Sequence, residues 1–586
     1  MPIEKRWEVK SRGDRATVDR LSATLRIPPV LANLLVQRGI DTEEKAHRFF
    51  NPQLADLHDP FLMKDMDKAV RRIEEAVRRG EKIMVYGDYD VDGTTAVALM
   101  YKFLRQQGHK NLEFYIPDRY AEGYGISRRG IDLAVHKGVK LIIALDCGIK
   151  AVEKVDYATE QGVDFIICDH HLPAEEIPHA VAVLDPKRTD CNYPFDELSG
   201  CGVGFKLVQA YAQRHNIPFS QIEPLLDLLA VSIASDIVSL TDENRILAFY
   251  GLKILNSKPS EGLASIIRLC NLVGQEITID DIVFKIGPRI NAAGRMRVAG
   301  CDNDTVKSGG HAAVELLVEG NEAAAHEFGK AIEDLNTDRK GEDRSVTEEA
   351  HRYVEQHPNI KQRKSFVIYN PKWMKGIVGI VASRLIETYY RPTVVLTKSN
   401  GLVTGSARSI PGFDLYQAVE SCADILENFG GHMYAAGLTL REENITEFER
   451  RFNEYVERNI DPQILVPQVE IDSELSFADI TPEFHRELNR FQPFGPGNAS
   501  PVFASRAVTD DGDAKLVGVS LEHLRMCLMQ SERPIMRLPA IAFQQPEHYE
   551  WVRGGRPIDI CYQIVENHYR GKVSMQLRIR DIKKAL

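Results

Sequence analysis

The sequence predicts a multidomain α/β protein that ends in a small β-barrel. Its 586 residues suffice for three to four domains, because a single hydrophobic core rarely grows beyond about 250–300 residues. Between residues 83 and 238, strand-like apolar runs alternate with helical spacing, which favours a parallel sheet covered by helices. From residue 469 onward, short β-rich segments alternate with turn residues. A helical stretch and a second α/β unit lie between these two regions.

The composition is that of an ordinary globular protein, and it narrows the function classes. The net charge of −11 argues against a chain covered by nucleic acid on all sides but permits a local basic groove. No apolar run approaches the roughly 20 residues that span a bilayer, and the N-terminus lacks the apolar core of a signal peptide. The nine cysteines form no Cys-x-x-Cys pair, so we expect reduced thiols and a cytoplasmic protein without membrane contact.

The chain is expected to begin with a polar helical segment at residues 1–50. Asn51-Pro52 and Asp59-Pro60 mark an extended connection, and helical spacing then runs from residue 66 to 79. Residues 51–262 are the predicted first α/β domain. Its strands are expected at 83–86, 112–116, 141–145, 165–168 and 181–184, with helices that include 130–136 and 152–161. In such parallel sheets, ligands bind beyond the carboxyl ends of the strands.

The turn after the first predicted strand carries three acidic residues at alternate positions. Asp88, Asp90 and Asp92 lie within Gly-Asp-Tyr-Asp-Val-Asp-Gly at 87–93, between a strand and a helix. Carboxylates this close raise one another's pKa unless a cation lies among them, and oxygen ligands suit Mg²⁺ or Mn²⁺. A polar turn or a calcium loop is the alternative. An EF-hand loop, however, needs oxygen ligands up to a Glu at its twelfth position, whereas this chain becomes apolar after Gly93.

Three further segments place acids or imidazoles at the end of an apolar run. Asp146 follows 141–145, Asp169-His170-His171 follow 165–168, and Asp236 ends the run 225–235. We expect these side chains to converge with the acidic turn. Carboxylates combined with imidazole fit hydrolytic metal chemistry better than a structural site, which would usually use cysteine.

Together these residues resemble the DHH phosphoesterase family. Further segments resemble the branch of that family formed by single-strand-specific exonucleases, in the order that the family has them. These segments are Gly-Pro-Arg-Ile-Asn-Ala-Ala-Gly-Arg-Met at 287–296, Gly-Ser-Ala-Arg-Ser at 405–409, Phe-Gly-Gly-His at 429–432 and Pro-Phe-Gly-Pro-Gly-Asn at 493–498. The resemblance implies a parallel-sheet DHH domain, a long connecting helix, a second α/β DHH-associated domain and a C-terminal OB-fold β-barrel.

Residues 263–357 are expected to form a helical connector that carries the motif at 287–296. Apolar residues recur at helical spacing from Ala312 to Arg344, and we expect the helix to continue to Val354. The simple interpretation is an amphipathic helix against a core, whereas the resemblance implies a long helix that joins two domains.

Residues 358–460 match a DHH-associated domain, with predicted strands at 366–369, 393–397 and 403–406 and a helix near 377–388. One position departs from the family, which usually has Trp-His where this sequence has Trp373-Met374. We therefore assign no substrate contact to that position.

Residues 461–586 are predicted to form the barrel, with strands at 502–507, 513–519, 524–529, 538–543, 558–566 and 573–582. The OB-fold is the usual nucleic-acid-binding version of such a barrel and binds single strands through basic grooves and stacking aromatics. The candidates for these contacts are Phe494, Phe503, Tyr562, His568, Tyr569 and Arg570. The alternative is that most of them fill the barrel interior.

The expected reaction is metal-assisted hydrolysis of a phosphodiester by two divalent ions, Mn²⁺ or Mg²⁺, roughly 3.5–4 Å apart. The expected metal ligands are Asp90, Asp92, Asp146, His170 and Asp236. Asp88 is expected to be a ligand or to orient one. The resemblance places His171 on the scissile phosphate, and Asp169 is expected to orient the two histidines.

A separate set of residues is expected to bind the terminal 5′ phosphate, because arginine binds phosphate bidentately and keeps its charge. The set is Arg119, Arg289, Asn291, Arg295, Ser406, Arg408 and His432. Anchoring one end of the strand would impose polarity on the reaction. For Arg295 and His432, a structural hydrogen-bonding role is an equal alternative.

The leading hypothesis is a 5′→3′ exonuclease that releases mononucleotides from single-stranded DNA. The resemblance implies roles in recombination and repair, with a single-strand-binding protein and a helicase as partners. One alternative is a DHH phosphodiesterase acting on short oligonucleotides or cyclic dinucleotides, but such enzymes are generally shorter and lack the barrel. A catalytically inactive scaffold is the other alternative, and the intact acids and histidines count against it.

Overall fold

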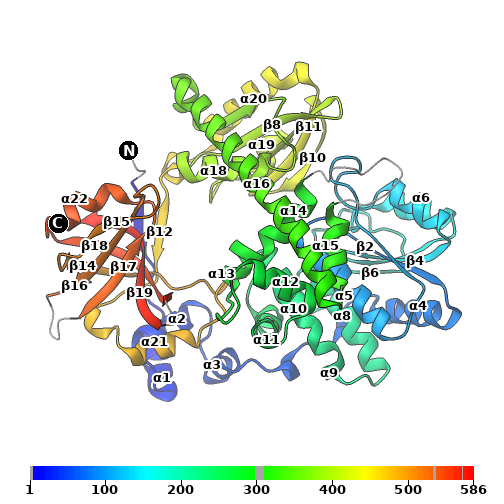
Figure 1. Cartoon of the computed structure of the whole chain (residues 1–586), viewed down its shortest axis with the longest axis horizontal. Helices are drawn as coiled ribbons and strands as arrows, with labels where there is room; N and C mark the ends of the chain where they lie inside the picture. The colour runs from blue at the N-terminus through cyan, green and yellow to red at the C-terminus, as the bar shows by residue number, and fades with distance from the viewer. Residues whose placement is uncertain (1–3, 297–308, 532–535, 570–571, 586) are drawn as a thin grey trace. The chain divides into compact units, whose positions relative to one another are not determined.

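The computed structural model describes residues 4–296, 309–531, 536–569 and 572–585 (Figure 1). Its contacts divide the chain into two compact units. One unit is Pro52–Asn459, and the other joins Met1–Asn51 to Ile460–Leu586.

The unit 52–459 begins with the predicted parallel sheet, in the order β3-β2-β4-β5-β6. Every adjacent pair is parallel. The strands are β2 (Lys82–Gly87), β3 (Leu112–Tyr115), β4 (Val139–Leu145), β5 (Asp164–Cys168) and β6 (Ala182–Leu184). All five lie where the sequence predicts them, and their carboxyl ends share one edge of the sheet.

Two helical layers cover this sheet, because alternate residues of a strand face opposite sides. Met84 and Tyr86 of β2 pack with α6 and α7, whereas Ile83 and Val85 pack with α4, α5 and α8. These helices are α4 (Met66–Arg79), α5 (Val91–Gln106), α6 (Arg128–His136), α7 (Val152–Glu160) and α8 (Gly200–Arg214).

A helical region follows the sheet and contains one correction to the prediction. Its helices are α9 (Phe219–Ile222), α10 (Leu226–Ser235), α11 (Asp242–Ser257), α12 (Glu261–Leu269), α13 (Ile279–Asp281), a π-helical turn at Ile282–Ile286, α14 (Gly287–Arg295), α15 (Gly309–Val318), α16 (Glu322–Gln356) and α17 (Pro358–Lys361). The single helix expected from Ala312 to Val354 is broken after Val318. The Glu319 carboxylate accepts the N–H groups of Gly320 and Asn321, and Asn321 then caps α16. These local bonds compete with the helix. The predicted long helix is thus α16, which is 35 residues long.

The second sheet of this unit has the order β10-β11-β9-β8-β7. Its strands are β7 (Phe366–Tyr369), β8 (Thr393–Ser399), β9 (Leu402–Arg408), β10 (Leu426–His432) and β11 (Ala435–Leu440), and its helices are α18 (Val378–Tyr389), α19 (Leu415–Glu420) and α20 (Ile445–Asn459). The sequence predicts β7, β8, β9 and α18. It does not predict the β10–β11 hairpin, because β10 has no buried residue and no apolar alternation.

The other unit contains a seven-stranded sheet in the order β13-β14-β18-β19-β17-β16-β15, in which β14 also pairs with β16. Its strands are β13 (Ser473–Glu474), β14 (Phe503–Asp510), β15 (Lys515–Val517), β16 (His523–Met529), β17 (Arg537–Ala542), β18 (Ile558–Tyr569) and β19 (Lys572–Lys584); its helices include α21 (Pro482–Asn489) and α22 (Tyr549–Arg553). Each predicted strand is present, and the pairing is consistent with an OB-fold.

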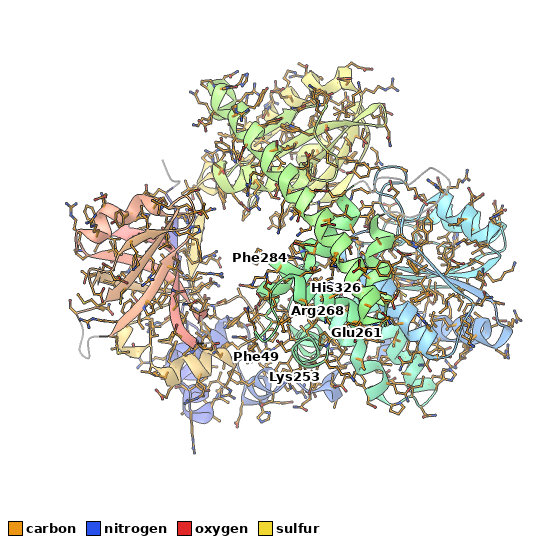
Figure 2. All side chains as sticks on the ribbon, viewed as in Figure 1. Phe49, Lys253, Glu261, Arg268, Phe284 and His326 are labelled. Atoms are coloured by element: carbon orange, nitrogen blue, oxygen red, sulfur yellow. The ribbon has the colours of Figure 1, made fainter. Side chains whose placement is uncertain are left out.

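The N-terminal residues belong to this second unit. Strand β1 (Arg6–Val9) pairs in parallel with β12 (Gln468–Ile471), and α1 (Arg15–Leu25), α2 (Pro29–Gln37) and α3 (Glu43–Phe50) pack against the same core. Phe49, labelled in Figure 2, lies on α3. Phe49 and Phe50 contact the ring of Phe491 edge to face, with centroids 5.5 and 5.3 Å apart.

The aromatic candidates for base stacking are partly corrected. Phe503 and Tyr562 are fully buried in the core, so they cannot offer a face to a base. Phe494 is partly buried against the same core. Arg570 and the side chains of His568 and Tyr569 lie outside what the structure describes. In the described part of the chain, every helix is too short or too polar to span a lipid bilayer.

Candidate active site

The acidic turn after β2 is a tight strand-to-helix connection. Asp90 caps α5, because its carboxylate accepts the N–H of Gly93 at 2.9 Å. A Cβ on Gly93 would lie 2.5 Å from the carbonyl oxygen of Asp88, so the turn requires glycine there. Asp88 is buried, and one of its carboxylate oxygens has no hydrogen-bond partner among the described residues. Burial and the nearby Asp90 raise its pKa well above the usual value.

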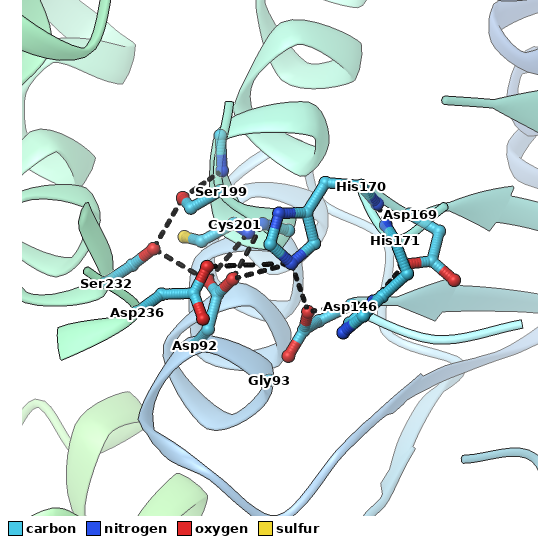
Figure 3. Close-up of polar contacts among 12 residues, drawn as sticks. Asp92, Gly93, Asp146, Asp169, His170, His171, Ser199, Cys201, Ser232 and Asp236 are labelled. Atoms are coloured by element: carbon cyan, nitrogen blue, oxygen red, sulfur yellow. Dashed lines mark hydrogen bonds and ion pairs between the residues drawn. The ribbon is translucent and has the colours of Figure 1, made fainter. Parts of the chain in front are cut away.

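Asp92 is held by the first turn of α8. Its carboxylate accepts the N–H groups of Gly200 at 2.6 Å and Cys201 at 2.9 Å, where the helix dipole favours an anion (Figure 3). The hydroxyl of Ser232 on α10 donates a third bond at 2.6 Å. Burial and Asp90 nevertheless raise the pKa of Asp92 to about 6. Three hydrogen bonds thus hold this carboxylate in place, although burial and the charge of Asp90 disfavour its ionised form.

His170 presents a lone pair to three carboxylates. Its Nδ1–H donates to the carbonyl of Leu198 at 3.0 Å, so Nε2 of the neutral ring carries no proton. Nε2 lies 3.2 Å from Asp146, 3.6 Å from Asp236 and 3.8 Å from Asp92 (Figure 3). Burial, followed by the neighbouring His171, lowers the pKa of His170 to about 3. The ring therefore does not supply the positive charge that these acids need.

Asp146 and Asp236 complete a group with Asp90, Asp92 and His170, which we call the acid cluster. Burial, followed by the Asp92 charge, raises the pKa of both well above the usual value. Oδ1 of Asp146 and Nε2 of His170 are both buried without a hydrogen-bond partner in the described chain. Buried polar atoms are nearly always paired, so these two unpaired atoms indicate a cation-binding site. Oxygen donors with one imidazole suit Mn²⁺ or Mg²⁺, and the residues therefore fit a metal centre.

Asp169 and His171 stand beside this cluster and differ from it electrostatically. The Asp169 carboxylate accepts the N–H groups of Ile149, His170 and His171 and the ring Nδ1–H of His171 at 2.7 Å. Burial opposes its charge, but these bonds outweigh burial and lower its pKa. Burial lowers the pKa of His171, but the hydrogen bond to Asp169 and the charge of that carboxylate outweigh burial and raise the pKa to about 9. His171 is therefore a half-exposed cation at the edge of the acid cluster, with the Tyr124 hydroxyl 3.2 Å from its Nε2.

Several of the predicted phosphate-binding residues also lie together. Burial and the charges of Arg119, Arg408 and Arg339 lower the pKa of Arg295 to about 9. We call these four residues the arginine group. Arg408 donates to the Ser406 hydroxyl at 2.8 Å. A Cβ on Gly379, in the first turn of α18, would lie 3.0 Å from both side chains. Clustered guanidinium groups beside a helix N-terminus form an anion site.

Contacts between the two α/β domains hold the arginine group in place. The Tyr120 hydroxyl donates to the Arg295 carbonyl at 2.6 Å, and Arg295 donates to the Gly376 carbonyl at 3.0 Å. The Arg119 guanidinium lies over the ring of Tyr89, within the acidic turn, at 3.9 Å. The anion site and the acidic turn are therefore directly connected.

The three remaining predicted phosphate-binding residues are Arg289, Asn291 and His432. Arg289 forms an ion pair with Glu333 of α16 at 2.6 Å, which favours a role in joining α14 to α16. Asn291 keeps a buried side-chain oxygen without a partner in the described chain. His432 ends β10, and its pKa is lowered by burial and then by Arg408, His171 and Lys187. The charges of Arg408 and His171 therefore both act on His432.

Sequence reasoning missed the residues that hold the cluster in shape. Ser232, the backbone of Gly200 and Cys201, and the Leu198 carbonyl are recognisable only in three dimensions. Lys187 is the exception, because it follows β6, the strand next to β5 in the sheet. Its charge acts on Asp236 and His432, and its position after a parallel strand was a usable signal.

Three family models match successive parts of the chain. The models named DHH family, N-terminal domain; DHHA1 domain; and RecJ OB domain match residues 82–233, 363–458 and 471–581 respectively. The fold and the site thus define a metal-dependent phosphoesterase of the DHH class. The predicted fold class, with its DHH domain, DHH-associated domain and OB-fold, is confirmed.

Individual relatives show which branch of the DHH class this chain is similar to. The single-stranded-DNA-specific exonuclease RecJ of Bacillus subtilis is 38% identical over 579 residues, which are 98% of this chain and 70% of that protein. The crystal structure of Thermus thermophilus RecJ with Mn²⁺ matches with a TM-score of 0.81 and 26% identity, covering 99% of this chain and 80% of that one. The Mg²⁺ complex of that protein matches with a TM-score of 0.75 and 25% identity, covering 99% and 79%. The chain belongs to the RecJ family of single-stranded-DNA-specific exonucleases.

Proposed function

We propose that this chain degrades single-stranded DNA from its 5′ end, using Mn²⁺ or Mg²⁺, and releases 5′-mononucleotides during DNA recombination and repair. One observation carries the proposal: the unprotonated Nε2 of His170 faces Asp146, Asp236 and Asp92 within 3.8 Å. Membership of the RecJ family supports it. The relatives crystallised with Mn²⁺ and Mg²⁺ support the choice of metal.

Five side chains are proposed to hold two divalent ions: Asp90, Asp92, Asp146, His170 and Asp236. Ions bound there would lower the pKa of a water molecule and stabilise the charge on the leaving oxygen. Asp88 has a carboxylate oxygen without a hydrogen-bond partner in the described chain, and the charge of Asp90 acts on it. We propose that Asp88 is a further metal ligand or that it orients one of these five.

The chain's own residues would position and neutralise the reacting phosphate. His171, protonated because its pKa is about 9, is proposed to donate its Nε2–H to a non-bridging phosphate oxygen. Asp169 holds that ring through Nδ1 and keeps it charged. The start of α8 and the Ser232 hydroxyl hold the carboxylate of Asp92 in place. This carboxylate would therefore not have to move when it binds a metal ion.

The arginine group is proposed to bind the terminal 5′ phosphate, together with Ser406 and His432. Burial and three neighbouring guanidinium groups lower the pKa of Arg295, and this concentration of positive charge favours binding of an anion. Because Arg119 stacks on Tyr89 of the acidic turn, the next phosphodiester along the strand would lie beside the acid cluster. Anchoring the first phosphate in this way would impose the 5′→3′ direction.

The domain division is also a proposal: an N-terminal segment at 1–50, the DHH catalytic domain at 51–262, a connector at 263–357, the DHH-associated domain at 358–460 and the OB-fold at 461–586. The packing of residues 1–51 with 460–586 suggests that the first and last parts act together. A single-strand-binding protein and a helicase are the proposed partners. The proposed location is the cytoplasm, where the described cysteines would stay reduced.

The decisive experiment offers 5′-labelled and 3′-labelled single strands, duplex DNA and a short dinucleotide to the wild-type protein and to Asp146→Ala, with and without Mn²⁺. We expect mononucleotides from the 5′ end of single strands only, with Mn²⁺ only, and none from the variant. Preferential cleavage of the dinucleotide would instead favour the oligonucleotide phosphodiesterase, which neither the OB-fold nor the RecJ relatives support.

A further inference from the structure

Two large exposed aliphatic side chains directly follow residues of the proposed active site in the sequence. Ile237 follows Asp236 and is 67% exposed, and Leu172 follows His171 and is 66% exposed. Val238, the next residue after Ile237, packs against the core, so the chain is not generally exposed here. Single exposed aliphatic residues are common, but two that adjoin separate parts of one polar site need an explanation.

Ile237 also has a backbone conformation that its side chain disfavours. Its φ is +60°, and among the described residues it is the only β-branched residue with a positive φ. It directly follows Asp236, the C-cap residue of α10, and glycine or asparagine usually makes the left-handed turn at this position. A β-branched residue is strained in this conformation, and such strain is concentrated at functional sites.

The turn itself does not account for the isoleucine. The left-handed residue ends α10 directly after Asp236, whose carboxylate oxygen lies 3.6 Å from His170 Nε2. Glycine at position 237 would make the same turn without strain, and a polar side chain would be better solvated. The exposed aliphatic group at this position is therefore available to contact a bound ligand.

We propose that Ile237 and Leu172 contact the nucleoside part of the nucleotide whose phosphodiester lies at the acid cluster. This inference rests on the proposed function, which brings a phosphate to Asp236 and His171 and brings the attached sugar and base with it. The faces of a base and a deoxyribose are the apolar parts of a single strand. Aliphatic contact with them involves no hydrogen bonds to base edges, and it therefore suits an enzyme that accepts any sequence.

The test compares two 5′-phosphorylated, 3′-labelled single strands in steady-state kinetics with Mn²⁺. One strand is all thymidine, and the other has tetrahydrofuran abasic residues at its first two positions. The variants are Ile237→Gly, Ile237→Asn and Leu172→Ala; glycine and asparagine both tolerate the left-handed turn. The matched control is Val273→Ala, because Val273 is 68% exposed but lies between α12 and α13.

For the thymidine strand, we expect each variant to raise KM about five- to tenfold with kcat within about twofold, the size of a lost aliphatic contact. KM for the abasic strand should be unchanged, the control should match the wild type, and Ile237→Gly should not melt earlier than the wild type. Equal losses on both strands, or no loss on either, would overturn the inference while leaving the proposed function intact. If the wild type degraded neither strand, the proposed function itself would fail.

Discussion

Nε2 of His170 lies 3.2 Å from Oδ1 of Asp146, and neither atom has a hydrogen-bond partner within the described residues. Because the Leu198 carbonyl fixes the proton of His170 on Nδ1, two electron-rich atoms face each other in a buried place. Protonating the ring would relieve this, but burial lowers the pKa of His170 to about 3. A cation bound by both side chains would explain why these two atoms lie so close together.

Replacing Asp146 by asparagine should stabilise the metal-free protein and abolish its activity. The change removes one charge from a repelling cluster, so the melting temperature in the presence of a chelator should rise by a few degrees. Activity with Mn²⁺ should fall at least about 1,000-fold, because a metal ligand is lost. Thermal melting and DNA hydrolysis test this, with Asp132→Asn on the exposed face of α6 as the control. A lower melting temperature would contradict the repulsion.

Gly200→Ala should impair catalysis, whereas Gly202→Ala should not. A Cβ at position 200 would lie 2.5 Å from the Cβ of Asp146 and would displace the N–H that binds Asp92. At position 202, two residues along the same helix, the nearest contact would be an ordinary 3.4 Å. Changes that displace metal ligands typically cost about 10–100-fold in activity. Similar kcat/KM values for the two variants would contradict this account of α8.

Arg408→Lys should weaken the preference for a 5′-phosphorylated strand. Lysine keeps the charge but loses the planar pair of donors, so the ratio of kcat/KM for 5′-phosphate over 5′-hydroxyl strands should fall about tenfold. The control is Arg450→Lys on α20, where the exposed Arg450 pairs with Glu447 and Glu454. An unchanged ratio for Arg408→Lys would remove Arg408 from the proposed 5′-phosphate site.

Asp185→Asn should stabilise the protein at alkaline pH but hardly at pH 4. Asp185 follows β6, is fully buried and has one carboxylate oxygen without a partner in the described chain. Burial raises its pKa to about 7, whereas the unfolded value is 3.8. A raised pKa means that the wild type loses stability as the pH rises from about 4 through 7, while the uncharged asparagine does not. Melting curves at pH 4, 6 and 8 should therefore diverge progressively; parallel curves would contradict the raised pKa.

The sequence predicts most of the acid cluster because three of its members follow parallel strands that are neighbours in the sheet. Asp90, Asp146 and His170 follow β2, β4 and β5, and the shared edge of a parallel sheet brings them together. Asp236 is different, because it caps the C-terminus of helix α10. The apolar run before it indicates a buried element, but it does not tell a helix from a strand.

The parts that could not be predicted depend on long-range contacts or on backbone groups. The Leu198 carbonyl and the Gly200 N–H leave no mark in side-chain identity, yet they orient His170 and Asp92. Likewise, nothing local indicates that Phe50 packs against Phe491, which is more than 400 residues away in the chain. Strand β10 has no buried residues and therefore no apolar alternation to predict it. It is a strand because its backbone pairs with β11.

Direct measurement of Mn²⁺ binding tests the central claim, that His170 and the surrounding acids hold the metal. Calorimetric titration should show tight binding to the wild-type protein, loss of that binding in His170→Ala, and wild-type binding in the surface variant His179→Ala. Equal Mn²⁺ affinity in His170→Ala and the wild type would contradict the account, because the metal would then be bound elsewhere.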